Sequence, residues 1–335
     1  MHYMRAEKRL SELDTLRGIA ALLVCLLHFG FCNFGITGLD LFFMISGFVI
    51  FMSISNSKSL KSFWIARFIR LFPIYILSIF IALFFCRICI VPSPISWNFV
   101  AGNLVMLQPV FKTTYFSIVY WTLYIEMMFY LFISVIWVIK MFKNMEWVLL
   151  IFLLLSLCLH SSYLLINSKS IERIYILTRG YLPLVSYFHI FASGIVFYLI
   201  YSKGLKLIHV LLLSLCLFLT CITHNISGNA MYFIGWPVRL LIVAGFYLAF
   251  FLIINHKARL LSSPYLTVTG AISYALYLEH STFGIWVKEF FSGKIGLVFS
   301  SIIGIIASLI LAFLITYFYD LPIRQRLKKL LLKEA

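Results

Sequence analysis

Charged residues are scarce in this sequence. Asp, Glu, Lys and Arg make up 11% of its 335 residues, whereas 63% are hydrophobic and the mean hydropathy is +1.04. Soluble domains contain about 25% charged residues, so this composition excludes a water-soluble globular protein. Apolar stretches of about 20 residues recur along the chain, and each is long enough to cross a hydrocarbon core about 30 Å thick. The sequence predicts an integral membrane protein with many spans.

Acidic residues are scarcer than basic ones. The chain has 27 Lys and Arg against 11 Asp and Glu, which gives a formal net charge of +16. In a soluble protein this excess would suggest nucleic acid. Here the basic residues gather in short segments between apolar stretches, where they mark the cytoplasmic side and face anionic lipid headgroups. We therefore expect membrane lipids as partners and no nucleic acid.

Paired metal-ligand or redox motifs are also missing. Most of the seven cysteines lie inside apolar stretches, as small buried hydrophobic residues do. Cys86 and Cys89 form one CxxC, but no second CxxC or nearby His accompanies it, so no metal is expected. The chain begins with charged residues instead of a short apolar stretch, and no long water-soluble segment lies at either end. We expect one membrane domain over 1–335, without a signal peptide or an additional soluble domain.

The expected fold is an all-α polytopic membrane protein with about ten spans and both termini in the cytoplasm. Residues 98–111 are apolar but short, and a crossing there would place every later basic loop outside. We therefore expect 91–119 to form an outer or re-entrant segment. The chain shows no inverted internal repeat of the kind found in many transporters. The predicted spans are 15–32, 39–55, 71–90, 120–139, 147–166, 181–201, 207–224, 232–254, 267–287 and 296–318.

The first predicted span carries three ionisable residues, Asp14, Arg17 and His28. Eleven positions along an α-helix amount to three turns plus about 20°, so Arg17 and His28 share one face about 16 Å apart. Asp14 falls within about 40° of that face. Ionisable groups inside a membrane are costly, and this stripe favours a polar channel from the cytoplasm. The alternatives are interfacial roles for Asp14 and Arg17 and a structural role for His28.

Three further clusters bring polar residues into or beside predicted spans. Arg67 and Arg70 are neighbours on a helix at a cytoplasmic edge, where they can clamp phosphate or simply set the topology. Glu126 lies inside a span, so we expect a polar partner or a substrate hydroxyl next to it. Glu279 and His280 lie deep in a late span, as functional groups or as polar contacts between helices.

These residues fall within five motifs arranged in one order along the chain. Together the motifs resemble those of the membrane acyltransferase 3 family, whose pattern includes Arg-x10-His, RxxR and W-S-L-x-x-E, and the resemblance covers nearly the whole chain. The family comprises O-acyltransferases of bacterial surface glycans and related acceptors. The motifs are Leu13-Asp-Thr-Leu-Arg17-Gly-Ile-Ala followed by His28, Gly38-Leu-Asp-Leu-Phe-Phe-Met-Ile-Ser46-Gly-Phe-Val-Ile, Arg67-Phe-Ile-Arg70, Trp121-Thr-Leu-Tyr-Ile-Glu126 and Ile272-Ser-Tyr-Ala-Leu-Tyr-Leu-Glu-His280.

The resemblance implies transfer of an acyl group, by default acetyl from cytoplasmic acetyl-CoA, to a hydroxyl of a cell-surface or lipid-linked glycan. It also implies the bacterial cytoplasmic (inner) membrane. A histidine, with an ordinary pKa of about 6.5, can take a proton from a hydroxyl at neutral pH. The candidate residues are His28, Arg17, Asp14 and Glu126 for catalysis, Arg67, Arg70 and Arg17 for CoA, and Ser46, Trp121, Tyr274, Tyr277, Glu279 and His280 for the acceptor.

The sequence departs from the family pattern at three places. Thr122 replaces the usual Ser, Glu279 stands where an aromatic residue is common, and Asp320-Leu-Pro322 replaces Glu-x-Pro. Some members carry a fused extracytoplasmic esterase-like domain, which we do not expect here. A proton-coupled transporter or flippase is the alternative function, because such carriers also bury ionisable residues; a non-catalytic scaffold is a third. The acceptor sugar, the acyl group, an acyl-enzyme step and the oligomeric state stay open.

Overall fold

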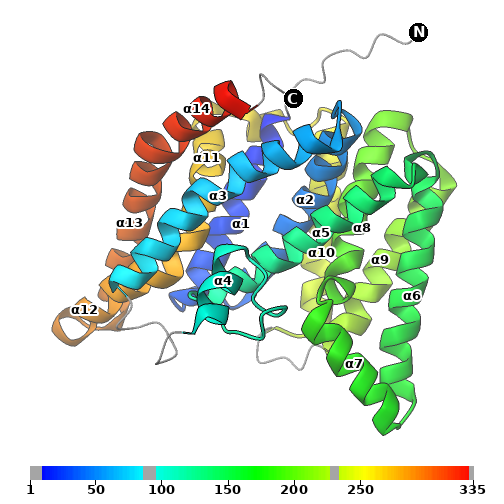
Figure 1. Cartoon of the computed structure of the whole chain (residues 1–335), viewed down its shortest axis with the longest axis horizontal. Helices are drawn as coiled ribbons and strands as arrows, with labels where there is room; N and C mark the ends of the chain where they lie inside the picture. The colour runs from blue at the N-terminus through cyan, green and yellow to red at the C-terminus, as the bar shows by residue number, and fades with distance from the viewer. Residues whose placement is uncertain (1–9, 86–95, 227–233, 332–335) are drawn as a thin grey trace.

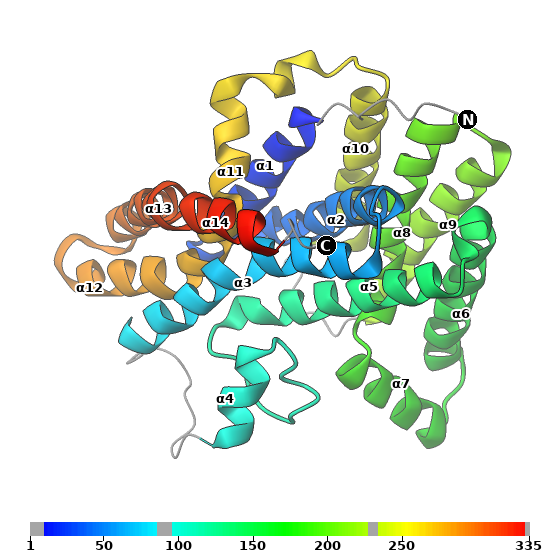
Figure 2. The ribbon, with the colours of Figure 1, turned by 45° about the horizontal axis from the view of Figure 1, so that its top comes forward.

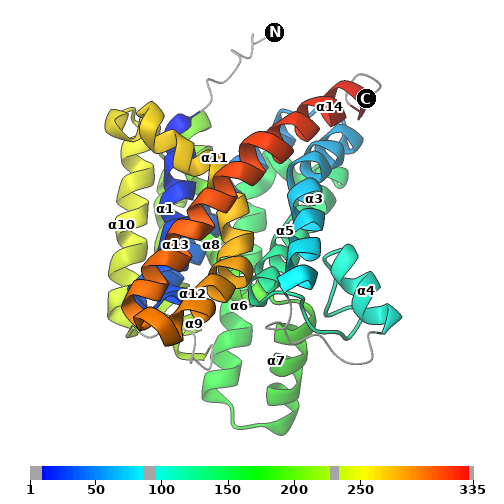
Figure 3. The same cartoon turned by 90° about the vertical axis from the view of Figure 1, so that its left-hand side faces the viewer.

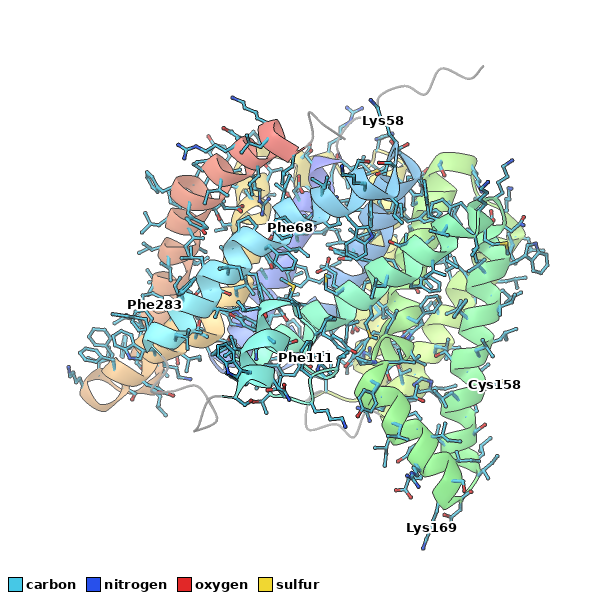
Figure 4. All side chains as sticks on the ribbon, in the orientation of Figure 1. Lys58, Phe68, Phe111, Cys158, Lys169 and Phe283 are labelled. Atoms are coloured by element: carbon cyan, nitrogen blue, oxygen red, sulfur yellow. The ribbon has the colours of Figure 1, made fainter. Side chains whose placement is uncertain are left out.

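The protein is described by a computed structural model that covers residues 10–85, 96–226 and 234–331. Within these ranges the chain is helical and contains no strand (Figure 1). Lys58 and Lys169 mark the two ends of the bundle, which we call the Lys58 end and the Lys169 end (Figure 4). The main helices are α1 (Ser11–His28), α2 (Thr37–Ser55), α3 (Leu60–Phe85), α5 (Trp121–Val138), α6 (Met145–Leu165), α8 (Leu184–Lys203), α9 (Leu207–Ile226), α10 (Trp236–Ile254), α11 (Pro264–Glu279) and α13 (Leu297–Leu314).

The apolar helices make this an integral membrane protein. Eight helical segments of the described chain are long and apolar enough to cross a membrane. The first and ninth predicted spans are not among them, and α1 carries three charged residues, Glu12, Asp14 and Arg17. The number of ten spans therefore stays a prediction.

Basic turns between helices lie at one end of the bundle. The turns after α5 and α8, which carry Lys140 and Lys203, lie at the Lys58 end (Figure 1). Lys203 Nζ lies 3.4 Å from Glu146 Oε1 at the start of α6, which places these two turns side by side. This clustering agrees with a common cytoplasmic side, but which side of the membrane the end faces stays a prediction.

Helix α3 extends beyond the predicted span. It carries Arg67 and Arg70 as helical neighbours, as the sequence predicts, and it starts at Leu60, before the predicted span start at residue 71. The reason is a pair of reciprocal bonds at its start, where the backbone N of Ser62 donates to Ser59 Oγ and the backbone N of Ser59 donates to Ser62 Oγ. The predicted end of this span, with Cys86 and Cys89, lies outside the described residues.

In the described part of the segment between α3 and α5, residues 96–120, the one α-helix is short, α4 (Trp97–Leu104). Eight residues span about 12 Å as a helix, far less than a hydrocarbon core, so α4 is too short to cross the membrane. Asn103 fixes the fold of the segment through its side-chain bonds to the carbonyls of Phe99 and Thr114. Tyr75 of α3 donates to the Asn103 carbonyl, which ties the segment to the bundle.

The helix α7 (Lys169–Tyr181) was not predicted. It occupies what the sequence pattern leaves as a connection between two spans, and it lies at the Lys169 end beside α6 (Figures 1 and 2). The pattern missed it because Lys169, Glu172, Arg173 and Arg179 keep its mean hydropathy low. Its apolar side chains are spaced for an amphipathic helix instead of a span.

The last two predicted spans are irregular. α11 passes through a π-helical turn (His280–Gly284) into α12 (Ile285–Ile295), and α13 passes through a second one (Ile315–Asp320) into α14 (Leu321–Leu331). Figure 3 shows α13 and α14 as one bent rod beside α11. Such π-turns are frequent at functional sites, and the first of them begins at a predicted site residue, His280.

Glycines set the close approach of α1 to α11. A Cβ on Gly270 would lie 2.0 Å from the Asp14 carbonyl oxygen, and one on Gly18 would lie 2.0 Å from Thr269 Oγ1. Small residues let helix backbones come this close in a membrane. The two helices that carry the predicted histidines are therefore packed directly against each other.

Candidate active site

A small pocket opens between α1, α2, α3, α5 and α11. It brings together residues that are far apart in the sequence and were predicted separately. Asp14, Arg67, Trp121 and the two predicted histidines do not line it. The predicted residues that do are Arg17, Ser46, Arg70, Glu126, Tyr274 and Tyr277.

Arg17 and Asp14 form one unit at the start of α1. Arg17 Nη1 donates to Asp14 Oδ1 over 2.9 Å, and both side chains are mostly buried. The pair lies one helical turn apart, as the predicted stripe requires. Asp14 therefore orients the guanidinium that reaches the pocket.

Glu126 has the polar partners that the sequence leads us to expect. Ser46 Oγ donates to Glu126 Oε1 over 3.2 Å, and Tyr130 OH donates to the same oxygen over 2.6 Å. Two hydroxyl donors compensate the carboxylate for lost hydration. Ser46, which also lines the pocket, fixes this carboxylate at the pocket wall, and its expected role in acceptor binding stays a prediction.

The two arginines of the RxxR motif face different surroundings. Arg70 lines the pocket, and its carbonyl accepts from Arg324 Nη2 of α14. Arg67 donates from Nη2 to Ser53 Oγ, while its Nε and Nη1 are buried and have no hydrogen-bond partner among the described residues. A buried guanidinium with free donors is costly, and an anionic ligand would satisfy it.

Tyr277 lies where the pocket approaches His280. Its hydroxyl is 2.7 Å from Thr122 Oγ1, so the Thr at this position supplies the hydroxyl that Ser supplies in the family pattern. Its ring centroid lies 5.9 Å from that of His280. Trp121, by contrast, packs its ring against Tyr187. Tyr277 therefore forms the boundary between the pocket and the histidines.

His28 and His280 meet at the far end of α1. His280 Nε2 lies 3.3 Å from His28 Nδ1, and the ring centroids are 4.9 Å apart in an edge-to-face arrangement. His280 is fully buried, and His28 is partly exposed. The sequence predicts both histidines as site residues but does not predict that they pair, because 252 residues separate them.

The backbone fixes the tautomers of this pair. His28 Nδ1 lies 2.9 Å from the Val24 carbonyl, and His280 Nδ1 lies 3.0 Å from the Leu276 carbonyl. A carbonyl oxygen only accepts, so both Nδ1 atoms carry hydrogen in the neutral rings. The Nε2 lone pair of His280 then faces the Nδ1–H of His28. The Nε2 of His28 is left as an acceptor with no hydrogen-bond partner among the described residues.

Two buried carboxylates, Glu279 and Asp40, have partners that the sequence did not predict. Glu279 accepts from Thr282 Oγ1 over 3.3 Å, while its other oxygen is buried without a hydrogen-bond partner in the described chain. Asp40 of the second motif, which the sequence analysis did not single out, forms a buried bidentate pair with Arg239 of α10 at 2.8 and 3.0 Å. Only a signal linking α2 with α10 could have revealed this pair.

Comparisons with known proteins agree with this arrangement. The model of a family described as an acyltransferase domain, Acyl_transf_3, matches residues 10–317. A protein of Acidianus two-tailed virus, named provisionally as an acetyltransferase, is 23% identical over 274 residues, which cover 79% of this chain and 80% of that protein. No solved structure matches significantly. The matched residues include α1, the five-helix pocket and the paired histidines, and the chain belongs to the acyltransferase 3 family.

Proposed function

We propose that this protein transfers an acetyl group from cytoplasmic acetyl-CoA to a hydroxyl of a cell-surface or lipid-linked glycan. The observation that carries the proposal is the His28–His280 pair, which leaves His28 Nε2 as a free proton acceptor beyond Tyr277 at the end of a cationic pocket. Family membership supports acyl transfer in general. The donor, the acceptor and the roles of the residues are what we propose beyond it.

Arg17, Arg67 and Arg70 are the proposed CoA ligands. CoA carries several phosphates, and guanidinium groups recognise phosphate with paired hydrogen bonds. Arg17 lies within electrostatic reach of Arg67 and Arg70, so the three form one cationic cluster. From this cluster the extended pantetheine arm follows the pocket toward Tyr277. The rise of α1 from Arg17 to His28 is about 16 Å, which sets the length that the arm must cover.

His28 is the proposed general base. Its Nε2 takes the proton of the acceptor hydroxyl while the acceptor oxygen attacks the thioester carbonyl and the C–S bond breaks. The proton then passes from His28 to the departing CoA thiolate. The products are the acetyl ester of the acceptor and free CoA. His28 Nδ1 lies 2.9 Å from the Val24 carbonyl and 3.3 Å from His280 Nε2, so its one hydrogen is shared between these two acceptors, which together steady the imidazolium that forms between these steps. In this proposal Asp14 orients Arg17, while Glu126 shapes the pocket wall.

Labelled acetyl-CoA distinguishes this reaction from transport. Membranes that contain the protein are incubated with acetyl-labelled CoA, and the glycan fraction is then analysed for ester-bound label. The proposal requires label that is released by mild base and that is absent with His28→Ala. A proton-coupled carrier would leave the glycan unlabelled in both preparations.

We further infer a bacterial cytoplasmic membrane location with both termini inside. The basic turns at the Lys58 end and the basic side chains of α14 support this orientation. A reporter that is active only in the cytoplasm, fused after residue 335, should be active. A periplasm-specific reporter at the same place that is active instead would reverse the orientation.

A further inference from the structure

An apolar groove of about 490 Å³ runs between α5, α6 and α8, away from the pocket described above. The rings of Phe132, Phe152 and Phe188 form part of its wall, with centroids 4.9 to 5.7 Å apart. Ser156 also lines it, but its hydroxyl donates to the Val185 carbonyl. The groove therefore offers hydrocarbon surface and no unsatisfied side-chain donor among its lining residues. A hydrocarbon chain matches such a surface.

A cation and two rings lie next to groove-lining residues in the sequence, at the Lys169 end of α6 and on α7. One helical turn beyond Ser156, the His160 ring packs 5.6 Å from the ring of Tyr175 on α7. Arg179, one helical turn after Tyr175 on α7, has its guanidinium carbon 5.9 Å from the Tyr175 ring centre. Arg179 is exposed and lies three residues before Leu182, which lines the groove. A positively charged side chain therefore lies near the Lys169 end of the apolar groove.

The groove and the candidate active site share α5. Glu126 lies on the pocket face of this helix, and Met128, Leu131 and Phe132 lie on the groove face, about 140° to 240° further round. Tyr124 OH donates to the Tyr181 carbonyl over 2.8 Å, which fastens the end of α7 to α5. A molecule seated in the groove thus contacts the helix that forms the active-site wall.

We propose that this groove binds the long hydrocarbon chain of a phosphate-linked lipid carrier, with Arg179 on its phosphate, so that the acceptor is a lipid-linked saccharide. The inference rests on the proposed function, because it names the acceptor of that same reaction. The apolar groove can bury the hydrocarbon chain, and the guanidinium of Arg179 can bind the phosphate. A free saccharide would use neither feature.

Binding is tested without turnover. The protein is placed in phosphatidylcholine nanodiscs with a polyprenyl phosphate that carries a photoreactive group in its chain, and the labelled peptides are mapped. We expect labels on α5, α6 and α8 and at least a fivefold loss with Leu155→Trp, which fills the groove. Leu154→Trp is the matched control, because Leu154 is also exposed on α6 but does not line the groove. Equal labelling of the two variants would overturn the proposal.

A competition experiment separates the lipid carrier from ordinary membrane lipid. Unlabelled polyprenyl phosphate should displace the probe, whereas an equal amount of phosphatidylglycerol should not. Equal displacement by both lipids would mean a general anionic-lipid site and would overturn the assignment to the acceptor. Arg179→Gln should weaken labelling about tenfold, as the loss of a charge-assisted bond predicts, and Lys169→Gln at the far tip of α7 should not.

Activity then distinguishes failure of this inference from failure of the proposed function. Acetylation is measured with a polyprenyl-phosphate-linked saccharide and with the same saccharide free in solution. Leu155→Trp should raise the KM for the lipid-linked acceptor about tenfold and leave the KM for acetyl-CoA unchanged. Unaltered use of the lipid-linked acceptor would overturn the groove while acyl transfer stands. If the unmodified protein acetylates neither acceptor, the proposed function itself fails, and the labelling result still reports on the groove.

Discussion

The cationic pocket and the histidine pair lie at opposite ends of α1 and are built differently. At the pocket end, Arg17 is held by the carboxylate of Asp14, and Glu126 is held by hydroxyl donors. At the other end, His28 and His280 have no acidic partner among the described residues and are held by the carbonyls of their own helices. One end offers fixed charge, and the other offers two imidazole rings anchored to backbone carbonyls.

Because of this difference, the two ends of α1 suit different tasks, the binding of an anion and the transfer of a proton. A fixed charge deep in a membrane is expensive, whereas a pair of neutral imidazoles anchored to carbonyls is not. The arginines suit the binding of an anionic donor near the membrane edge, and the histidines suit a proton transfer further inside. Substitutions at the two ends should therefore alter different kinetic constants.

The largest effect is expected for His28→Ala. Loss of a general base typically lowers turnover by about 10²- to 10⁴-fold, and here kcat should fall to the limit of detection. The measurement is ester formation from labelled acetyl-CoA at saturating donor. Protein level and thermal stability in the membrane serve as controls, and a variant that folds normally but keeps more than a tenth of the kcat would remove His28 from catalysis.

The double substitution Arg67→Ala and Arg70→Ala should act on donor binding. Each charge-assisted phosphate contact contributes about 1.5–3 kcal/mol, so the loss of two should raise the KM for acetyl-CoA by at least about 100-fold. Turnover at saturating donor should stay within a few fold. Lys140→Ala, at an exposed turn of the same end, is the control. If the KM does not change, these arginines do not bind CoA.

His280→Ala should lower kcat about tenfold, because His28 loses the acceptor that steadies its imidazolium. The KM for acetyl-CoA should not change, since His280 does not line the pocket. His280→Gln restores a hydrogen-bond acceptor and should recover part of the loss. Equal damage by both substitutions, with a lowered thermal stability, would indicate a purely structural role.

The smallest effect is expected at the boundary between the two regions. Thr122→Val removes the hydroxyl that bonds Tyr277, which should lower kcat/KM by a few fold, in line with about 0.5–1.5 kcal/mol for one hydrogen bond. Thr122→Ser keeps the hydroxyl and should match the unmodified protein. Should the Ser variant be as impaired as the Val variant, packing of the methyl group matters at this position, and the hydrogen bond does not.

Much of the fold was predictable because the membrane imposes length and hydropathy on each span. The stripe of Asp14, Arg17 and His28 was predictable too, because it depends only on helical periodicity within one segment. The helix α7 was missed because its charges hide it from a search for apolar spans. The early start of α3 depends on two local serine caps that a hydropathy pattern does not reveal.

Partnerships between helices could not be predicted. The contact of His28 with His280 depends on how α1 and α11 cross, which is set by Gly18 and Gly270. The Asp40–Arg239 pair likewise joins residues 199 positions apart. Periodicity within a single helix says which face a residue occupies, but it does not say which helix lies opposite.

The division between donor binding and chemistry is tested most directly by measuring acetyl-CoA binding to His28→Ala and to the Arg67→Ala, Arg70→Ala variant side by side in nanodiscs. The structure predicts that the His28 variant binds acetyl-CoA as tightly as the unmodified protein and forms no product, whereas the arginine variant binds about 100-fold more weakly. Weakened binding by the His28 variant together with full binding by the arginine variant would contradict this account.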